Sequence, residues 1–458
     1  MSKRLGNIVE GYKTLEENSV DVLRFYLMRK ATPIDSLNFS FEEMKSRPYQ
    51  VISTLYNLHK YLKQNGDYDN FNQDIHSLKW SIDNKLLSSP DYWILSKLQN
   101  LINESTISYK DTNFNLVTSS IDNFIIESFS QIYLPMVRNE IWNDDESQLN
   151  RRLSIYSIIS HILYTLDILL HPISPFITEY LSHSIFGDEP ILGRTWPSVT
   201  DNLINNDLES EFSSLQIIIS QSNSARMKGK LKRRWPLKSS MVYSQNHNLS
   251  TLSNHKELLQ TFCNIRDIEY VDDIEQLPIT LSIFPNYEIL GKKLKADINE
   301  FRRIIKEQDA LVLFKHFIQN ESFTFTINEN SYPVMKNEIK FEFNPTDDYV
   351  LSSKSGIVVI IPKERDSDLF IEGYIRDLAR RIQSERKETG LAPSTMLKNT
   401  LIYGIEESTK TLLIPKLSEL KYLIRTNDVQ VVEDLTLGSN WKDIDIDGTK
   451  LKICLINS

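Results

Sequence analysis

The chain begins with a short basic turn that has the composition of a phosphate-binding loop. Its first seven residues read Met-Ser-Lys-Arg-Leu-Gly-Asn. Lys3 is a flexible point charge, and Gly6 permits a sharp turn before a helix. These residue types suit a polyphosphate, but a solvated basic terminus is an equally ordinary reading of so short a segment. The segment by itself therefore leaves both interpretations open.

A second basic segment has the composition of a nucleic-acid contact. Residues 225–237 read Ala-Arg-Met-Lys-Gly-Lys-Leu-Lys-Arg-Arg-Trp-Pro-Leu. Lysine neutralises phosphates, arginine binds them in a fork, and tryptophan can stack on a base. The alternative is a solvated basic face. The candidate RNA contacts in this segment are Arg226, Lys228, Lys230, Lys232, Arg233, Arg234 and Trp235.

A third basic segment lies on a helix that we predict over residues 369–389. Arg376, Arg380 and Lys387 fall on one face of this helix. Like charges four residues apart are mildly unfavourable unless an anionic partner is present, so we predict RNA contact here as well. Arg381 instead has acidic residues four positions away on both sides. Its expected role is an exposed ion pair worth about 0.3–0.5 kcal/mol.

No other residues have the spacing of a catalytic or metal site. The histidines within predicted helices are interpreted as packing residues, and no Ser/His/Asp set or paired carboxylates stand out. Cys263 and Cys454 are the two cysteines, and both have apolar neighbours. This predicts reduced, buried thiols and no zinc or other metal site.

The overall composition is that of an ordinary globular protein of two or three domains. The chain has 458 residues, 40% hydrophobic and 25% charged, with a net charge of −9. This charge argues against a generic DNA or RNA binder, although cations can gather on one face. The apolar run at residues 158–170 contains polar residues, and the N-terminus has no apolar signal core. We therefore predict a cytoplasmic location and no membrane or DNA partner.

The first 200 residues predict an antiparallel bundle of long amphipathic helices. Ser40 and Glu43 form a capping box, and Pro48 kinks or restarts the helix that follows. A loop is predicted over residues 63–73, and further helices over 91–108, 113–135 and 151–170.

After residue 200 the pattern changes to short alternating strands mixed with helices, which predicts one or two small α+β domains. No internal repeat is evident. The predicted strands cover residues 240–244, 279–283, 323–327, 339–343, 349–352, 357–361 and 451–456. The predicted helices cover residues 207–228, 297–319, 369–389 and 408–425.

The first residues, taken with the helix after them, resemble the Lys-Met-Ser-Lys-Ser ("KMSKS") loop of class I aminoacyl-tRNA synthetases. The leading lysine of that loop is missing here, and Arg4 replaces its final serine. The matching positions are Met1, Ser2, Lys3, Leu5, Gly6, Asn7, Asp21, Leu23 and Arg24.

The later segments resemble isoleucyl-tRNA synthetases in particular. Residues 225–237 are similar to a segment that follows the helical bundle in that family, and valyl enzymes have a looser version. Residues 376–387 contain Arg-x-x-x-Arg-Arg-Ile-Gln-x-x-Arg-Lys, which is similar to a helix of the isoleucyl enzymes. Matches within the bundle lie at residues 91–98, 134–142, 171–179 and 196–197.

The resemblance implies a mainly α fold, with an antiparallel helical bundle of the class I anticodon-binding type followed by one or two small α+β C-terminal domains. Residues 1–40 correspond to the KMSKS loop and stem-contact helices. Residues 41–200 correspond to the bundle, and residues 201–458 to a C-terminal junction and tRNA-binding region.

The activity that the resemblance implies is the ATP-dependent attachment of isoleucine to tRNA(Ile), with Mg²⁺ in the full enzyme. Lys3 matches the lysine that contacts the ATP phosphates, and Met1, Ser2, Gly6 and Asn7 match the loop around it. In the family the "HIGH" signature, the Rossmann core and the editing domain precede this loop. The 458 residues alone are therefore expected to be inactive, with a separate N-terminal catalytic subunit as partner if the gene is split. The alternatives are a stand-alone tRNA-binding module, a valyl-type fragment and a scaffold.

Overall fold

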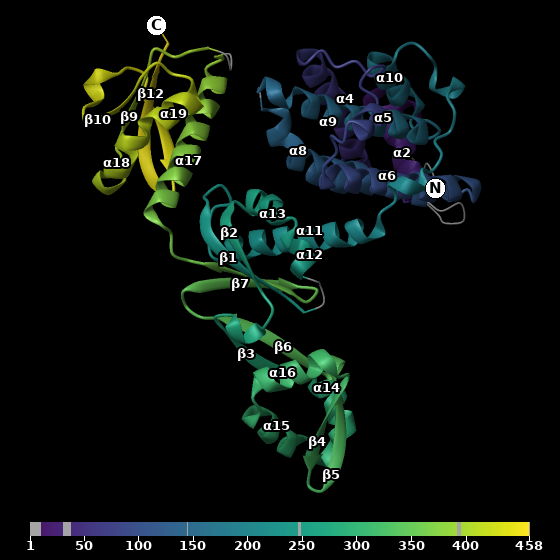
Figure 1. Cartoon of the computed structure of the whole chain (residues 1–458), viewed down its shortest axis with the longest axis vertical. Coiled ribbons are helices and arrows are strands. Elements are labelled where there is room, and N and C mark those ends of the chain that lie inside the picture. Colours follow the sequence, from purple (N-terminus) through teal and green to yellow (C-terminus); the bar gives the residue numbers. More distant parts are fainter. Residues whose placement is uncertain (1–10, 31–37, 144, 246–248, 392–394, 458) are drawn as a thin grey trace, which may run out of the picture. The chain divides into compact units, whose positions relative to one another are not determined.

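A computed structural model of the chain describes residues 11–30, 38–143, 145–245, 249–391 and 395–457 (Figure 1). It divides into two compact units, Met1–Phe212 and Ser213–Ser458, here called the N-terminal and C-terminal units. The division falls within helix α11 (Asn206–Lys228), slightly later than the predicted boundary after residue 200. The predicted phosphate loop, residues 1–7, lies outside the described residues.

The N-terminal unit is a bundle of helices, as predicted. Helix α9 has buried side chains on all its faces, so it lies at the centre of the bundle. The helices are α1 (Gly11–Glu17), α2 (Val20–Lys30), α3 (Phe41–Lys45), α4 (Arg47–Tyr68), α5 (Leu78–Asp83), α6 (Ser89–Lys110), α7 (Phe114–Asn123), the π-helix η2 (Phe124–Tyr133), α8 (Leu134–Ile141), α9 (Leu149–Leu170) and α10 (Pro175–Phe186). Short 3₁₀ turns are η3 (Glu146–Gln148), η4 (Ile191–Gly193) and η5 (Asp201–Leu203).

The apolar composition of α9 reflects burial within the protein. Among the described residues, Glu146–Leu170 is the single helical stretch long and apolar enough to cross a membrane. However, 89% of its apolar window is buried inside the chain. A central helix of a bundle, which is covered on every side by other helices, has the same composition.

The helix start at Pro48 is confirmed, the Ser40–Glu43 capping box is confirmed in part, and two predictions about helix ends in this unit are wrong. The Ser40 side chain accepts a hydrogen bond from the Glu43 backbone N–H, and Pro48 lies in the first turn of a new helix. In place of the reciprocal bond to the Glu43 carboxylate, the Ser40 backbone N–H donates to the Tyr26 hydroxyl at 2.9 Å. The predicted loop at residues 63–73 is partly helical, because α4 continues to Tyr68. The helix predicted to end at Pro135 passes through η2 into α8, where Pro135 lies in the first turn. A proline is tolerated there because its missing N–H is not needed.

Hydrogen bonds join helix α2 to helix α10 and the turn before it. The Arg24 side chain donates from Nε to the Ile173 carbonyl at 2.7 Å. The Asp21 carboxylate accepts from the Ile177 backbone N–H at 2.6 Å, at the start of α10. A carboxylate at a helix N-terminus is favourable because it faces unsatisfied N–H groups. Asp21 and Arg24 of α2 are therefore fixed against α10 and the turn before it.

The C-terminal unit contains two four-stranded sheets. The first has the strand order β2-β1-β8-β7, and the second has the order β10-β9-β12-β11. In each sheet two neighbouring strands are parallel, and the other two pairs are antiparallel. The strands are β1 (Leu237–Ser244), β2 (Ile265–Val271), β7 (Tyr349–Lys354), β8 (Ile357–Pro362), β9 (Asn399–Tyr403), β10 (Val429–Val432), β11 (Lys442–Ile446) and β12 (Thr449–Ile456).

A separate subdomain is inserted between β2 and β7. It has its own apolar core around Leu290, Phe301, Phe317 and Phe325. The predicted single helix at residues 297–319 is wrong, because Asp309 caps a second helix. Its elements are β3 (Ile279–Pro285), α14 (Tyr287–Leu294), α15 (Ile298–Glu307), α16 (Ala310–Gln319), β4 (Ser322–Ile327), β5 (Asn330–Met335) and β6 (Ile339–Pro345).

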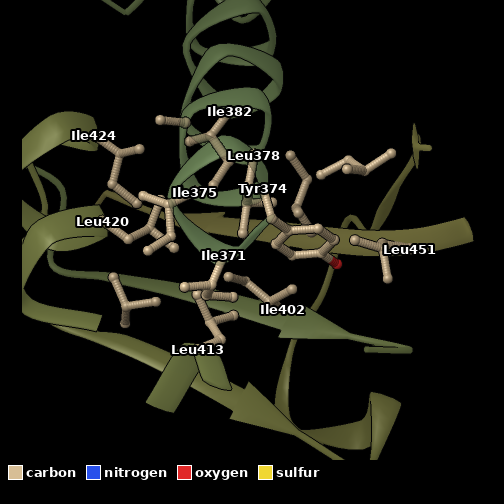
Figure 2. Packing of buried hydrophobic residues seen from close by; sticks show 14 of the residues in the cluster. Ile371, Tyr374, Ile375, Leu378, Ile382, Ile402, Leu413, Leu420, Ile424 and Leu451 are labelled. Carbon is tan, nitrogen blue, oxygen red and sulfur yellow. The ribbon is translucent and has the colours of Figure 1, made fainter. Parts of the chain in front are cut away.

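Helices cover the two four-stranded sheets. In the chain, α11 precedes strand β1 of the first sheet, and α12 (Leu249–Ser253) and α13 (Lys256–Cys263) lie between β1 and β2. The second is built with α17 (Ser367–Glu388), α18 (Glu407–Leu413) and α19 (Leu417–Ile424). Figure 2 shows the apolar stripe of α17, with Ile371, Tyr374, Ile375, Leu378 and Ile382, facing the strands and the other helices of this sheet. The predicted strands are all present, and the sequence analysis missed β2, β5, β9, β10 and β11.

Candidate nucleic-acid interface

Arg226, a predicted RNA contact, is buried inside the C-terminal unit. Its residue is 1% exposed. Nη1 donates to the carbonyls of Lys232 at 3.1 Å and Trp235 at 2.8 Å. Nη2 donates to the carbonyls of Cys263 at 2.8 Å and Asn264 at 2.9 Å. Arg226 therefore closes the loop that follows α11 and fastens this loop to the end of α13.

The charged guanidinium of Arg226 forms its hydrogen bonds with neutral backbone carbonyls. Burial lowers the pKa of its guanidinium to about 10, which leaves the group charged at neutral pH. A buried cation is costly unless its donors are satisfied; here four carbonyls accept from the terminal nitrogens Nη1 and Nη2, and Nε has no partner. Removing the side chain would take one donor from each of these four acceptors; the Lys232 and Asn264 carbonyls would keep the backbone N–H groups of Trp235 and Leu237.

Trp235 is also buried, at 2% exposure. Its Nε1–H donates to the Asp377 carboxylate of α17 at 2.9 Å, and its ring packs edge-to-face against Phe370. Gly373 lies directly under the ring, because a Cβ built there would be 2.8 Å from the Trp235 ring atoms. In this structure the ring is packed within the protein, and the base stacking predicted for it stays a prediction.

Asp377 joins the two predicted basic segments at one point. Besides Trp235, it pairs with Lys232 at 3.3 Å and with Arg234 at 3.9 Å. Lys232 also pairs with Asp447, at 3.3 Å. A carboxylate that is 14% exposed and shared by several cations fixes the loop backbone on α17. The 225–237 segment and the 376–387 segment, far apart in sequence, therefore meet in the fold.

The remaining predicted cations are exposed on the end of α11, on the loop after it and along α17. Arg234 has a side chain that is 50% exposed, and Arg376 one that is 41% exposed. Arg376 donates to Asn264 Oδ1 at 3.3 Å and pairs with Glu372 at 2.6 Å, which adds a second tie between α17 and the end of α13. The other exposed residues of the set are Lys228, Lys230, Arg233, Arg380 and Lys387.

Two arginines that shape this surface were not among the predicted contacts. Arg266 of β2 is 57% exposed and pairs with Glu372, so it adds another cation beside Arg376. Arg386 is buried and donates to backbone carbonyls, as Arg226 does. The predicted pairing of Arg381 is wrong, because Asp377 and Glu385 pair with other lysines. Charge alone could not distinguish the buried arginines from the exposed ones.

The arrangement suits electrostatic binding and offers no nucleophile. Within the described part of the chain, no group of three or more His, Cys, Asp or Glu side chains could hold a metal ion. Exposed arginines and lysines on a rigid helix and a clasped loop are the groups that bind phosphates. The structure therefore presents a candidate interface for a polyanion, in which Arg226, Trp235 and Asp377 hold the contact residues in place.

Comparisons with known proteins match this chain to tRNA ligases. Residues 91–241 match the family model of the anticodon-binding domain of tRNA ligase. The chain is 30% identical over 404 residues to isoleucine–tRNA ligase of Saccharolobus solfataricus, covering 85% of this chain and 39% of that protein. It is 25% identical to isoleucine–tRNA ligase of Methanocella arvoryzae, covering 99% of this chain and 41% of that protein.

The solved structures give a fainter likeness. A chain from the crystal structure of an Agrobacterium radiobacter K84 LeuRS–tRNA–LeuAMS ternary complex aligns with a TM-score of 0.34 and 19% identity. It covers 45% of this chain and 23% of that one. The chain spans about two fifths of the length of the curated relatives above. The sequence matches extend over nearly all of it, and the chain therefore belongs to the isoleucine–tRNA ligase family, as a C-terminal portion that includes the anticodon-binding domain.

Proposed function

We propose that this chain is the tRNA-recognising portion of an enzyme that attaches isoleucine to tRNA(Ile) with ATP and Mg²⁺ in the cytoplasm. The observation that supports this most strongly is the meeting of two basic segments at Asp377, which makes one cationic surface from the loop after α11 and from helix α17. The match to the anticodon-binding domain, residues 91–241, extends through the loop that forms one half of this surface.

We assign two different roles to the predicted contact residues, according to whether they are exposed or buried. Arg233, Arg234, Arg376 and Arg380 are exposed and are proposed to contact phosphates, with Lys228, Lys230 and Lys387 beside them. Arg226 and Trp235 are proposed to act through the loop that they fix. Each phosphate contact contributes about 0.7–0.9 to the slope of log affinity against log salt.

Affinity for tRNA tests the proposal. The double variant Arg233→Ala/Arg234→Ala should weaken binding of tRNA(Ile) transcript by about tenfold or more and should lower the salt slope by about 1.5. The matched control is Arg303→Ala, because Arg303 of the inserted subdomain is 64% exposed and pairs with Glu300 and Glu307 on its own helix. Its removal should leave affinity and slope unchanged. Equal effects of both variants, or a flat salt response of the wild type, would contradict the proposal.

The ATP contacts rest on the family resemblance alone. We propose that Lys3 contacts the ATP phosphates, with Met1, Ser2, Gly6 and Asn7 shaping the loop, when residues 1–40 lie beside a catalytic portion. The 458-residue polypeptide by itself should therefore give no isoleucine-dependent exchange between ATP and pyrophosphate. Exchange that appears on addition of an N-terminal catalytic portion, and is lost in Lys3→Ala, would support the assignment. Exchange by the polypeptide alone would refute it, and tRNA binding without any restored exchange would favour the stand-alone module.

A further inference from the structure

The two halves of the C-terminal unit have the same plan. In each, a long helix leads into a strand, two short helices follow, and a second strand pairs in parallel with the first. A hairpin then adds two antiparallel strands on the other side, giving the orders β2-β1-β8-β7 and β10-β9-β12-β11. We call α11 to β8, without the inserted subdomain, the first module, and α17 to β12 the second module.

Buried arginines make the same contacts in both modules. Arg226 donates to the carbonyls of Trp235, Cys263 and Asn264. Arg386 donates to the carbonyls of residues 395, 424 and 425. The arginines and their first acceptors are both 160 positions apart (386 − 226 and 395 − 235), and the other acceptors are 161 apart (424 − 263 and 425 − 264). A coincidence of fold alone would not reproduce the contacts at a constant spacing.

The helix ends repeat at the same spacing. Helices α13 and α19 begin at residues 256 and 417, and they end before the left-handed residues Asn264 (φ 52°) and Arg425 (φ 51°). After the parallel strands, Asp273 and Asp434 each cap a 3₁₀ turn. The clearest difference is the inserted subdomain, which stands in the first module where the second has the short segment 433–441.

One equivalent position differs in a way that stereochemistry alone does not explain. In the turn after the long helix, the backbone N–H of Leu231 donates to Arg226 and that of Leu391 donates to Arg386, at 2.8 and 2.9 Å. The residue before each leucine is left-handed: Gly390 in the second module (φ 74°) and Lys230 in the first (φ 55°). Glycine is favoured there because a side chain strains the left-handed backbone. Lys230 keeps this strain and is exposed.

The turns that follow the long helices of the two modules also differ in charge. Residues 227–235 contain five cations and no acid, whereas the equivalent residues 387–395 contain one lysine and one glutamate. Cations near a helix C-terminus gain a little from the helix dipole, but the second helix ends without such a cluster. The cluster of cations and the lysine with a strained left-handed backbone are therefore both found in the first module.

We propose that the C-terminal unit arose by duplication of one module, and that the first module's turn became an RNA-phosphate site with Lys230 at its tip, while the second module supports it. This rests on the proposed function, since the RNA is the tRNA bound there. The support is direct, because Asp377 of the second module's helix holds Trp235 and Lys232 of the first module's turn. Lys230 is accordingly retained for its charge at a position where glycine would be more stable.

Substitutions at the two equivalent positions, made in the full chain, test this inference. Lys230→Gly should stabilise the turn, because the backbone strain that it relieves outweighs the freedom that it adds to the unfolded chain. We expect the equilibrium constant for local opening of the turn to fall by about two- to fivefold. The same variant should bind tRNA(Ile) transcript about three- to tenfold more weakly, with a salt slope lower by about 0.7–0.9. Lys230→Arg keeps the charge and should bind as the wild type does. Gly390→Ala should destabilise its turn and leave affinity unchanged.

The outcomes separate this inference from the function on which it rests. Opening is read from amide hydrogen exchange of peptides that end α11 and α17, and affinity from titrations at several salt concentrations. If the wild type binds tRNA and Lys230→Gly binds equally well with an unchanged slope, the assignment of Lys230 is overturned. It is also overturned if Gly390→Ala weakens binding as much as Lys230→Gly does. Failure of the wild type to bind tRNA would overturn the proposed function itself.

Discussion

Replacing Gly373 with alanine gives a sharp test of how the two basic segments are joined. An ideal Cβ at this position would lie 2.8 Å from Cγ and Cδ2 of Trp235 and 3.1 Å from its Cβ. Real Cβ atoms do not approach so closely, and a buried indole ring cannot give way as the end of a flexible side chain would. The Gly373→Ala variant must therefore move Trp235 away from α17 or bend the helix.

Two opposing terms decide the magnitude. Glycine in a helix interior is less favourable than alanine by about 0.5–1 kcal/mol, so the substitution gains that amount from the backbone. Overpacking in a filled core costs about 1–3 kcal/mol. The expected net loss is up to about 2.5 kcal/mol, which raises the equilibrium constant for local opening of this region by up to about 70-fold. The displaced ring also loses its hydrogen bond to Asp377.

Gly291 provides the matched control, because it lies within helix α14 and a Cβ there would meet nothing within 4 Å. Gly291→Ala should therefore show only the backbone gain. The assay is amide hydrogen exchange of peptides covering α17 and α14, combined with tRNA affinity. Faster exchange in α17 and weaker binding are expected for Gly373→Ala alone. If Gly373→Ala stabilises its helix as Gly291→Ala does, the packing described for Trp235 is refuted.

Three further results are expected. Arg386→Lys should destabilise the second module by about 1–3 kcal/mol, because one ammonium cannot reach the three carbonyls that accept from the guanidinium. Amide hydrogen exchange of this module measures the change, and an unchanged exchange rate would contradict the stabilising role of Arg386. Burial raises the pKa of the Cys263 thiol to about 11, so the folded state holds this proton more tightly than the unfolded chain. The resulting stability is complete below the ordinary pKa near 9 and is lost, by up to about 2–3 kcal/mol, as the pH rises from 9 to 11; urea unfolding at pH 8, 9.5 and 11 with Cys263→Ala as control checks this, and equal pH profiles would contradict it. Trp235→Phe should weaken tRNA binding about threefold or more by freeing the loop from Asp377, whereas Trp142→Phe, on the N-terminal unit, leaves that loop intact.

The helical bundle and most strands could be predicted because their patterns are local. The apolar stripes of α4 and α6 repeat every three to four residues, α9 is a long helix buried on all its faces, and β7 and β8 contain short apolar runs that lie in a buried sheet. Strand β2 was missed because its burial falls on Ile265, Ile268 and Val271, every third residue, as in a helix. Alternation of apolar residues therefore does not identify an edge strand, such as β2, whose buried residues do not alternate.

The burial of Arg226 and the repeat of the module could not be predicted from the sequence. An arginine in a run of cations has the pattern of a surface residue, and its burial depends on carbonyls of Cys263 and Asn264, which sequence patterns do not place beside it. The contacts that define the module are mostly with backbone atoms, so most side chains were free to change. The modules share few residues at equivalent positions, among them Leu231 with Leu391 in the turns and Tyr243 with Tyr403 in strands β1 and β9.

The loop after α11 and helix α17 are proposed to form one tRNA-binding surface. The most direct measurement is amide hydrogen exchange of the full chain with and without tRNA(Ile), compared peptide by peptide. We expect peptides covering residues 228–235 and 376–387 to become protected together, at the same tRNA concentration, while those of the inserted subdomain at residues 286–319 do not. Protection of one segment without the other, or of neither segment while tRNA is bound, would contradict it.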